Sequence, residues 1–140
     1  MYLIDTNVIS EHRKRERADP GVVAFFRRLV TRAEPAFLSS ITIGELRRGV
    51  ESIRYRGDAR QVKVLEKWLQ AILDDWQERI LSLDLEAAQV WGRLRVPHAE
   101  HELDKQIAAI ALVNDLTVVT RNVAHFAATG VRLLDPFALH

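Results

Sequence analysis

Four polar side chains stand beside apolar segments of the chain, where they could do chemistry together. They are Asp5, Glu45, Asp104 and Asn122. The first and the last follow short apolar runs typical of buried strands, whereas the other two lie in the first turns of predicted helices. In a fold of alternating strands and helices, strand ends and helix starts of this kind meet at one edge of the sheet. We therefore expect these four side chains to lie close together.

Three carboxylates gathered at such an edge would repel one another, and the pKa of each would rise. A divalent cation relieves this repulsion, and oxygen ligands favour Mg²⁺ or Mn²⁺ over Zn²⁺. Such a cation polarises a phosphoryl group and lowers the pKa of a bound water, so that hydroxide attacks phosphorus in line. The chain has no cysteine, so it offers no thiolate ligand. The residue types favour Mg²⁺ as cofactor, with Mn²⁺ as a substitute, and phosphodiester hydrolysis as the reaction.

Each of these residues also has a purely structural interpretation. Asp5 could cap the helix that follows it, and Glu45 could complete a capping box with Thr42. Asp104 could serve only as a favourable charge at a helix N-terminus. Asn122 could simply form a turn. Each residue alone is therefore weak evidence, and the case depends on their corresponding places in the fold.

Histidines are the other metal ligands that the sequence offers. His98 and His101 are three residues apart, a spacing that could bind a metal on a helix. Pro97 precedes them, however, and no third ligand lies nearby in the sequence. We interpret both as exposed residues. His125, which stands before Phe126, is interpreted as a side chain that packs after the fourth strand.

Short apolar runs alternate with helical patterns along the whole chain. Strands are predicted over residues 2–5, 36–39, 80–83, 117–120 and 131–134. Helices are predicted to begin at a cap formed by Thr6 or Asn7, at Pro20 (with an apolar face of Val23, Phe26 and Val30), at Thr42 and at Asp58, and to cover residues 86–95 and 103–115. This alternation predicts an α/β fold with three layers, α/β/α, around a mainly parallel sheet of roughly five strands. A single domain over residues 1–140 is expected.

The composition is that of an ordinary globular protein. Of the 140 residues 48% are hydrophobic and 28% are charged, and no run approaches the ~20 apolar residues of a membrane span. The N-terminus lacks the pattern of a signal peptide, so we expect a cytoplasmic protein without a membrane role.

The net charge is +1, but most arginines lie in the first half. Charge alone slightly favours solvated helix faces, yet the asymmetry permits a nucleic-acid substrate, whose phosphates could contact Arg13, Arg47, Arg48 and Arg54.

Four segments, in order, resemble the motifs of PIN domains. They are Tyr2–Ser10 (YLIDTNVIS), Ser40–Gly49 (SITIGELRRG), Leu103–Ala111 (LDKQIAAIA) and Thr120–Phe126 (TRNVAHF). A lone Asp-Thr-Asn would be weak evidence, but four ordered motifs in a chain of this length are specific. The sequence is most similar to PIN-domain toxins of the VapC and FitB type, from type II toxin–antitoxin systems.

The resemblance implies a role for each matching residue. Asp5, Glu45 and Asp104 match the acidic residues that hold the metal, and Asn122 falls where many relatives carry a fourth acid. This departure puts a second tightly held metal ion in doubt. Supporting hydroxyl groups would come from Thr6 and Thr120. The family implies an endoribonuclease that leaves 5′-phosphate and 3′-hydroxyl ends, forms a homodimer and is blocked at its active site by a small VapB-like antitoxin.

Three other functions remain open at this point. The first is a catalytically inactive PIN-like module that binds or scaffolds, and the second is a stand-alone PIN nuclease in RNA processing. The third is a phosphatase with Asp5 as covalent nucleophile. Such phosphatases usually place a second acid two residues later, where this chain has Asn7, which argues against that reaction.

Overall fold

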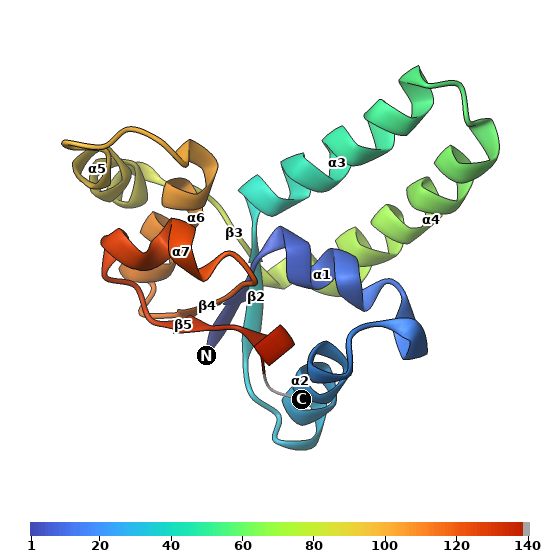
Figure 1. The fold of residues 1–140 in the computed structure, drawn as a ribbon, viewed down its shortest axis with the longest axis horizontal. Helices are drawn as coiled ribbons and strands as arrows, with labels where there is room; N and C mark the ends of the chain where they lie inside the picture. Colours follow the sequence, from blue (N-terminus) through green and yellow to red (C-terminus); the bar gives the residue numbers. More distant parts are fainter. Residues whose placement is uncertain (139–140) are drawn as a thin grey trace.

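Five short strands form one parallel sheet in the computed structural model, which describes residues 1–138 (Figure 1). The strands are β1 (Tyr2–Ile4), β2 (Ala36–Ser39), β3 (Ile80–Leu81), β4 (Thr117–Val119) and β5 (Leu133–Leu134). Their order in the sheet is β3-β2-β1-β4-β5, and every pairing is parallel. The predicted strands were placed correctly, although several end one or two residues earlier or begin later than expected.

Within residues 1–138, seven α-helices connect and cover the strands. They are α1 (Thr6–His12), α2 (Pro20–Thr31), α3 (Ser40–Tyr55), α4 (Ala59–Trp76), α5 (Leu85–Leu94), α6 (Glu102–Val113) and α7 (Val123–Phe126). Short 3₁₀ helices occupy Arg15–Arg17, Gln77–Arg79, Ala127–Thr129 and Pro136–Ala138. Helices α3 and α4 form a hairpin that projects from the sheet, away from α5 and α6 (Figure 1). Among residues 1–138, no helix is both long and apolar enough to cross a bilayer.

Both faces of the sheet are buried, which confirms the three-layer α/β/α fold. Successive side chains of a strand point to opposite faces. Ile4 accordingly packs with apolar residues of α1, α2, α3 and α4, and its neighbour Leu3 packs with those of α5, α6 and α7. Helix α6 is the most deeply buried, since Ile107 and Ile110 are both fully enclosed. The sheet therefore holds the start of α6 at a fixed place beside the end of β1.

Helix α2 shows where the sequence pattern gave the wrong face. The helix begins at Pro20, as predicted, and the carboxylate of Asp19 caps it by accepting from the Gly21 amide. It buries Val22, Phe25 and Leu29. The predicted apolar face lies one residue later at each position and is wrong, because Val30 at its end is 82% exposed. The segment Val22–Val30 carries two apolar stripes, and only packing against the sheet selects one.

Candidate active site

Asp5 lies at the carboxyl end of the central strand β1 and is 2% exposed. It is the N-cap of α1, because Asp5 Oδ1 accepts from the Thr6 amide at 2.8 Å. The structural interpretation of Asp5 as a cap is therefore confirmed, whereas the predicted caps Thr6 and Asn7 are the first two residues of the helix and are wrong. On its other side, Thr120 Oγ1 donates to Asp5 Oδ2 at 2.7 Å, and Asn7 Nδ2 donates to the same oxygen at 3.2 Å. Thr120 directly follows β4, the neighbour of β1. Parallel pairing of the two strands thus brings the first and fourth sequence motifs together.

Burial raises the pKa of Asp5 from 3.8 to about 6. The hydrogen bonds from Thr120 and Thr6 act in the opposite direction, because they stabilise the carboxylate. The negative charges of Asp104 and Glu45 raise the pKa further. This coupling means that three acidic groups, 40 and 99 residues apart along the chain, lie near enough to repel one another.

Glu45 lies in the second turn of α3 and faces Asp5 through a shared threonine. Ser39 caps this helix, because its hydroxyl accepts from the Thr42 amide at 3.0 Å. The predicted capping box between Thr42 and Glu45 is therefore wrong. Instead, Thr6 Oγ1 donates to Glu45 Oε1 at 2.7 Å. Because the Thr6 amide also bonds to Asp5, this one residue orients two of the three acidic side chains.

Asp104 lies in the first turn of α6, as predicted, but it has an unexpected partner. Asp104 Oδ2 lies 2.8 Å from His125 Nδ1, across 21 residues of sequence. The ring of His125 in turn stacks on that of His101, with centroids 4.1 Å apart. These side chains line a pocket of about 360 Å³ together with Glu45, Glu102, Leu103 and Asn122. The pocket therefore brings Glu45, Asp104 and Asn122 together, while Asp5 lies buried behind it.

The three carboxylates are ligands of the kind that a hard divalent cation prefers, but their oxygens do not lie close enough together to coordinate one. Carboxylate oxygens are the ligands that Mg²⁺ and Mn²⁺ prefer, and a cation would remove the repulsion that raises the pKa of Asp5. Among residues 1–138, the ligating atoms of Asp5, Glu45 and Asp104 do not all lie within 4.8 Å of one another. Since Asp104 Oδ2 is bonded to His125, a cation shared by all three would bind the other oxygen of Asp104, Oδ1, or displace the histidine.

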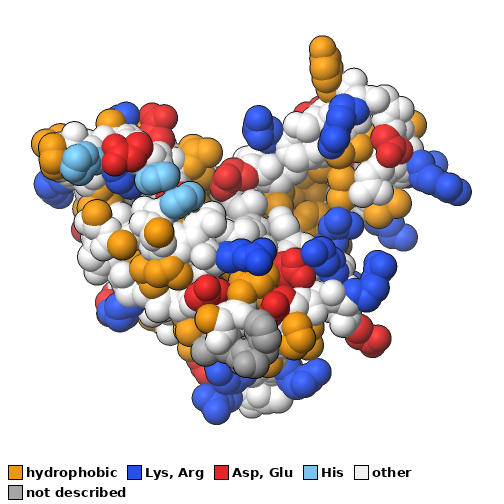
Figure 2. All heavy atoms as spheres, in the orientation of Figure 1, with side chains coloured by type: hydrophobic (Ala, Val, Ile, Leu, Met, Phe, Trp, Pro, Cys, Tyr) orange, Lys and Arg blue, Asp and Glu red, His pale blue; other side chains and the backbone are white. Residues whose placement is uncertain are grey.

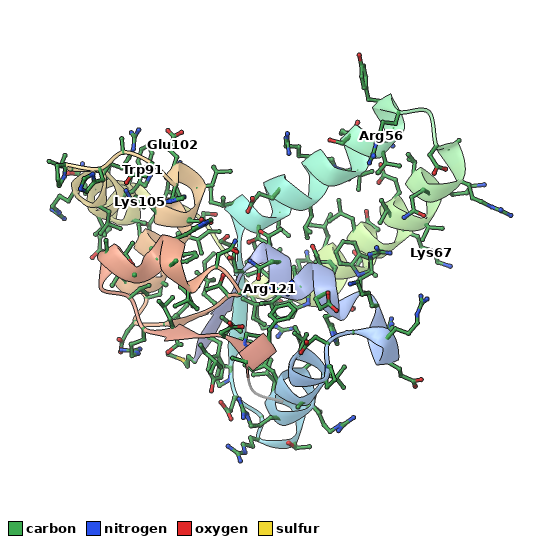
Figure 3. All side chains as sticks on the ribbon, viewed as in Figure 1. Arg56, Lys67, Trp91, Glu102, Lys105 and Arg121 are labelled. Atoms are coloured by element: carbon green, nitrogen blue, oxygen red, sulfur yellow. The ribbon has the colours of Figure 1, made fainter. Side chains whose placement is uncertain are left out.

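Asn122 and Asn7 complete the edge of the sheet. The backbone amide of Asn122 donates to Thr120 Oγ1 at 3.0 Å, which is the turn expected of this residue. Asn7, which the sequence suggested only as a helix cap, bridges the first and fourth motifs: its Nδ2 donates to Asp5 and its Oδ1 accepts from the Arg121 amide at 3.1 Å. Figure 3 shows Arg121 at the centre of the molecule, between these elements. The Asp-Thr-Asn sequence was the available signal for Asn7.

A groove of about 470 Å³ opens beside Glu45, between α1, α3 and α4. Arg13 and Lys14 lie along it, and the Arg13 guanidinium is 5.9 Å from the centre of the Trp68 ring. Figure 2 shows Lys and Arg side chains along the α3–α4 hairpin and near α1, on this side of the molecule. Glu11 also lines the groove and pairs with Lys14 at 2.9 Å, so the cation beside Trp68 that is left for a phosphate is Arg13. A guanidinium next to an aromatic ring can contact both a phosphate and a base.

The other three arginines proposed for phosphate binding lie outside this lining. Arg47 and Arg54 both pair with Glu66, at 2.8 and 2.7 Å, and both are also within ion-pair distance of Glu51. Arg48 is exposed on α3. These pairs connect α3 to α4, so Arg47 and Arg54 have a structural use in the hairpin that the sequence did not reveal.

Comparison with known proteins agrees with the fold and with the motifs. The family model described as PIN domain matches residues 2–131. Toxin FitB of Neisseria gonorrhoeae is 36% identical, over 98% of this chain and 99% of its own. VapC ribonuclease Y4jK of Sinorhizobium fredii is 29% identical, over 98% of each chain. Among solved structures, a chain of FitAcB from Neisseria gonorrhoeae matches with a TM-score of 0.85 and 35% identity, over 99% of both chains.

Proposed function

Because this chain belongs to the PIN-domain family, we propose that it is a Mg²⁺-dependent endoribonuclease and the toxin of a VapBC-type toxin–antitoxin module. The observation that carries the proposal is that Thr6 joins Asp5 to Glu45 at the end of the central strand, beside the pocket that Glu45 and Asp104 line. Asp5 also caps α1 and accepts from Thr120, but these structural contacts do not explain the two other acids beside it. A group of acids of this kind is what a cation site looks like before the cation is bound.

Asp5, Glu45 and Asp104 are the residues that would hold Mg²⁺. When bound there, the ion would polarise a phosphoryl oxygen and lower the pKa of water for attack on phosphorus. The hydroxyl groups of Thr6 and Thr120 keep the carboxylates of Asp5 and Glu45 in place. Asn122, as a neutral amide at the pocket, adds no charge, and for that reason we propose one tightly held metal ion rather than two.

RNA would reach the carboxylates along the groove beside Glu45. Arg13 carries positive charge for the RNA backbone, since Lys14 is paired with Glu11, and Trp68 offers an aromatic face for a base. Binding through these contacts depends on the release of counterions and weakens as salt is added. A single-stranded or looped segment fits this groove better than a duplex, because only unpaired bases can stack on a side chain.

A small VapB-like antitoxin is the proposed partner. The support for it is that one relative bears the name Toxin FitB and that the other is called a VapC ribonuclease. A segment that enters the pocket would block it by covering Glu45 and Asp104. A toxin that cleaves cellular RNA acts in the cytoplasm, where its substrate is. The homodimer expected from the family resemblance stays a prediction.

Cleavage mapping on total cellular RNA, with Mg²⁺ and with EDTA, tests the reaction. We expect cuts with 5′-phosphate ends that EDTA abolishes, and a loss of at least about 100-fold in Asp104→Asn, which removes one negative charge from the metal site without changing volume. Asp115→Asn is the matched control. It removes an exposed carboxylate just after the same helix, at a backbone φ of +54° that Asn tolerates.

Two results would contradict the proposal. If Asp104→Asn cleaves RNA at the rate of the wild type, the carboxylate has no part in the reaction. If the wild type binds RNA but cuts none at any Mg²⁺ or Mn²⁺ concentration, the chain is an inactive binding module of the PIN type. If the protein cleaves RNA but no antitoxin gene lies beside its own gene, the nuclease proposal stands and only the proposed role as a toxin is lost.

A further inference from the structure

Three side chains at the mouth of the active-site pocket form a group that the carboxylate site does not explain. Each of His101, Asp104 and His125 offers a ligating atom, and these atoms all lie within 4.8 Å of one another. His101 precedes α6, Asp104 lies in its first turn, and His125 comes from α7 on the other side of the pocket. Figure 2 shows histidine side chains gathered on this side of the molecule, opposite the α3–α4 hairpin. The sequence showed no third ligand near His98 and His101, but the fold brings Asp104 and His125 to His101, so that prediction is wrong.

The donor set of this group suits a different metal from the carboxylate site. Two imidazole nitrogens and one carboxylate oxygen are ligands typical of Zn²⁺, whereas Mg²⁺ prefers oxygen alone. Ligands of a tetrahedral Zn²⁺, each at about 2.0–2.1 Å, lie roughly 3.3 Å from one another. The three atoms here are at most 4.8 Å apart, but the two imidazoles are stacked with planes 16° apart, so one ring must tilt out of the stack before both nitrogens point at one ion. The exposed ring of His101 has room to do so. A fourth position would remain open to the pocket, where water can complete the coordination.

The loop before α6 is held in place by contacts that do not involve the imidazole of His101. His101 has a left-handed backbone, with φ +57°, and its imidazole makes no hydrogen bond that caps α6. The segment before α6 is fixed from two sides: the buried Lys105 donates to the carbonyl of His98, and the Trp91 indole donates to the carbonyl of Glu102 at 3.2 Å (Figure 3). The loop therefore presents His101 at a defined place, which lowers the entropy that metal binding would cost.

The histidines are also open to solvent. His101 is exposed, and the side chain of His125 is 41% exposed. A metal ion can reach them through the same pocket of about 360 Å³ that leads to Asp104. The simpler interpretation is that His125 only orients Asp104 through their hydrogen bond. That interpretation explains His125 but gives no reason for His101 to stack on it.

We propose that His101, Asp104 and His125 bind Zn²⁺, and that this ion excludes the catalytic cation because both need Asp104. With zinc bound, the charge of the ion would neutralise the Asp104 carboxylate and repel a second cation, so that Asp5 and Glu45 would lack their third ligand. The binding of zinc stands on the geometry of the three ligands alone. Its inhibitory effect rests on the proposed nuclease function, so the two parts are tested separately.

Zinc affinity is measured first, without RNA, on the untagged full chain after removal of metal. Zn²⁺ is titrated in competition with a chromophoric chelator, and Co²⁺ is titrated separately to read the visible absorption of a tetrahedral site. We expect one site per chain in the wild type, and affinity at least about tenfold weaker in His101→Asn and in His125→Asn, since even outer-shell changes cost 10–100-fold. His98→Asn, an exposed histidine in the same loop, is the matched control and should bind as the wild type does.

His101→Asn is the decisive variant, because Asn tolerates the left-handed backbone and the residue is exposed. Circular dichroism checks that each variant is folded. The zinc site is refuted if the wild type binds no Zn²⁺ in this titration. It is equally refuted if His101→Asn and His125→Asn both keep the affinity of the wild type, because the ion would then lie elsewhere.

The second measurement is RNA cleavage at fixed Mg²⁺ with increasing Zn²⁺, each variant compared with its own rate without zinc. We expect His101→Asn to need at least about ten times more Zn²⁺ than the wild type for half inhibition. If the wild type and His101→Asn are half inhibited at the same Zn²⁺ concentration, zinc does not compete with the catalytic cation for Asp104, even if it binds to the wild type. If the wild type never cleaves RNA, the nuclease proposal fails, while the zinc titration still decides the metal site.

Discussion

The buried carboxyl group of Asp5 should make the metal-free protein less stable as the pH rises. Its pKa is about 6 in the folded protein, against an ordinary 3.8, mainly because burial penalises the charged form. Over this range Asp5 keeps its proton in the folded protein while the unfolded chain has lost it. The free energy of unfolding therefore falls with rising pH, from just below pH 4 to just above pH 6.

The gap between the two pKa values corresponds to about 3 kcal/mol over the full range. Between pH 4.5 and 7.5 the expected contribution is about 2 kcal/mol, because part of the change lies below pH 4.5. Asp5→Asn isolates it. Asn has the same volume and can still accept from the Thr6 amide, but it does not ionise. The difference in free energy of unfolding, variant minus wild type, should thus increase by about 2 kcal/mol across this interval.

Urea unfolding in EDTA buffers at the two pH values measures this difference. Asp115→Asn serves as the control and should follow the wild type at both, because Asp115 is exposed. If Asp5→Asn also runs parallel to the wild type, then burial does not hold the proton on Asp5. The electrostatic coupling that supports the cation site would then be wrong as well.

Two further outcomes concern RNA and the cell. Arg13→Ala, in the groove beside Glu45, should weaken RNA binding and reduce the slope of log K against log salt by about 0.7–0.9; an unchanged slope would show that Arg13 contacts no phosphate. Expression of the wild type alone should stop growth, and Asp104→Asn should relieve this arrest whereas Asp115→Asn should not. Arrest that persists in Asp104→Asn would point to toxicity by binding instead of cleavage.

The order of strands and helices could be predicted because apolar runs and caps are local signals. The exact residue at which each element starts could not always be predicted. Before α3 the chain offers Ser39, Ser40 and Thr42 as caps, and only the folded backbone selects Ser39. In α2 two apolar stripes compete, and the sheet decides which is buried. Both errors arise where several residues satisfy the same local rule.

The place of Asp5, Glu45 and Asp104 in the site could be predicted because a parallel sheet gathers strand ends and helix starts. The contacts of His125 could not be predicted. Its bond to Asp104 spans 21 residues and its stack on His101 spans 24, and neither leaves a spacing that a sequence pattern can reveal. The ion pairs of Arg47 and Arg54 with Glu66 were hidden for the same reason, since the hairpin of α3 and α4 brings them together.

The position of a bound cation tests the central claim most directly. Anomalous diffraction from a crystal soaked in Mn²⁺ should give a peak within about 2.0–2.6 Å of carboxylate oxygens of Asp5, Glu45 and Asp104. A peak held by the histidines alone, or none beside Asp5 at saturating Mn²⁺, would mean that these three acids do not share a metal.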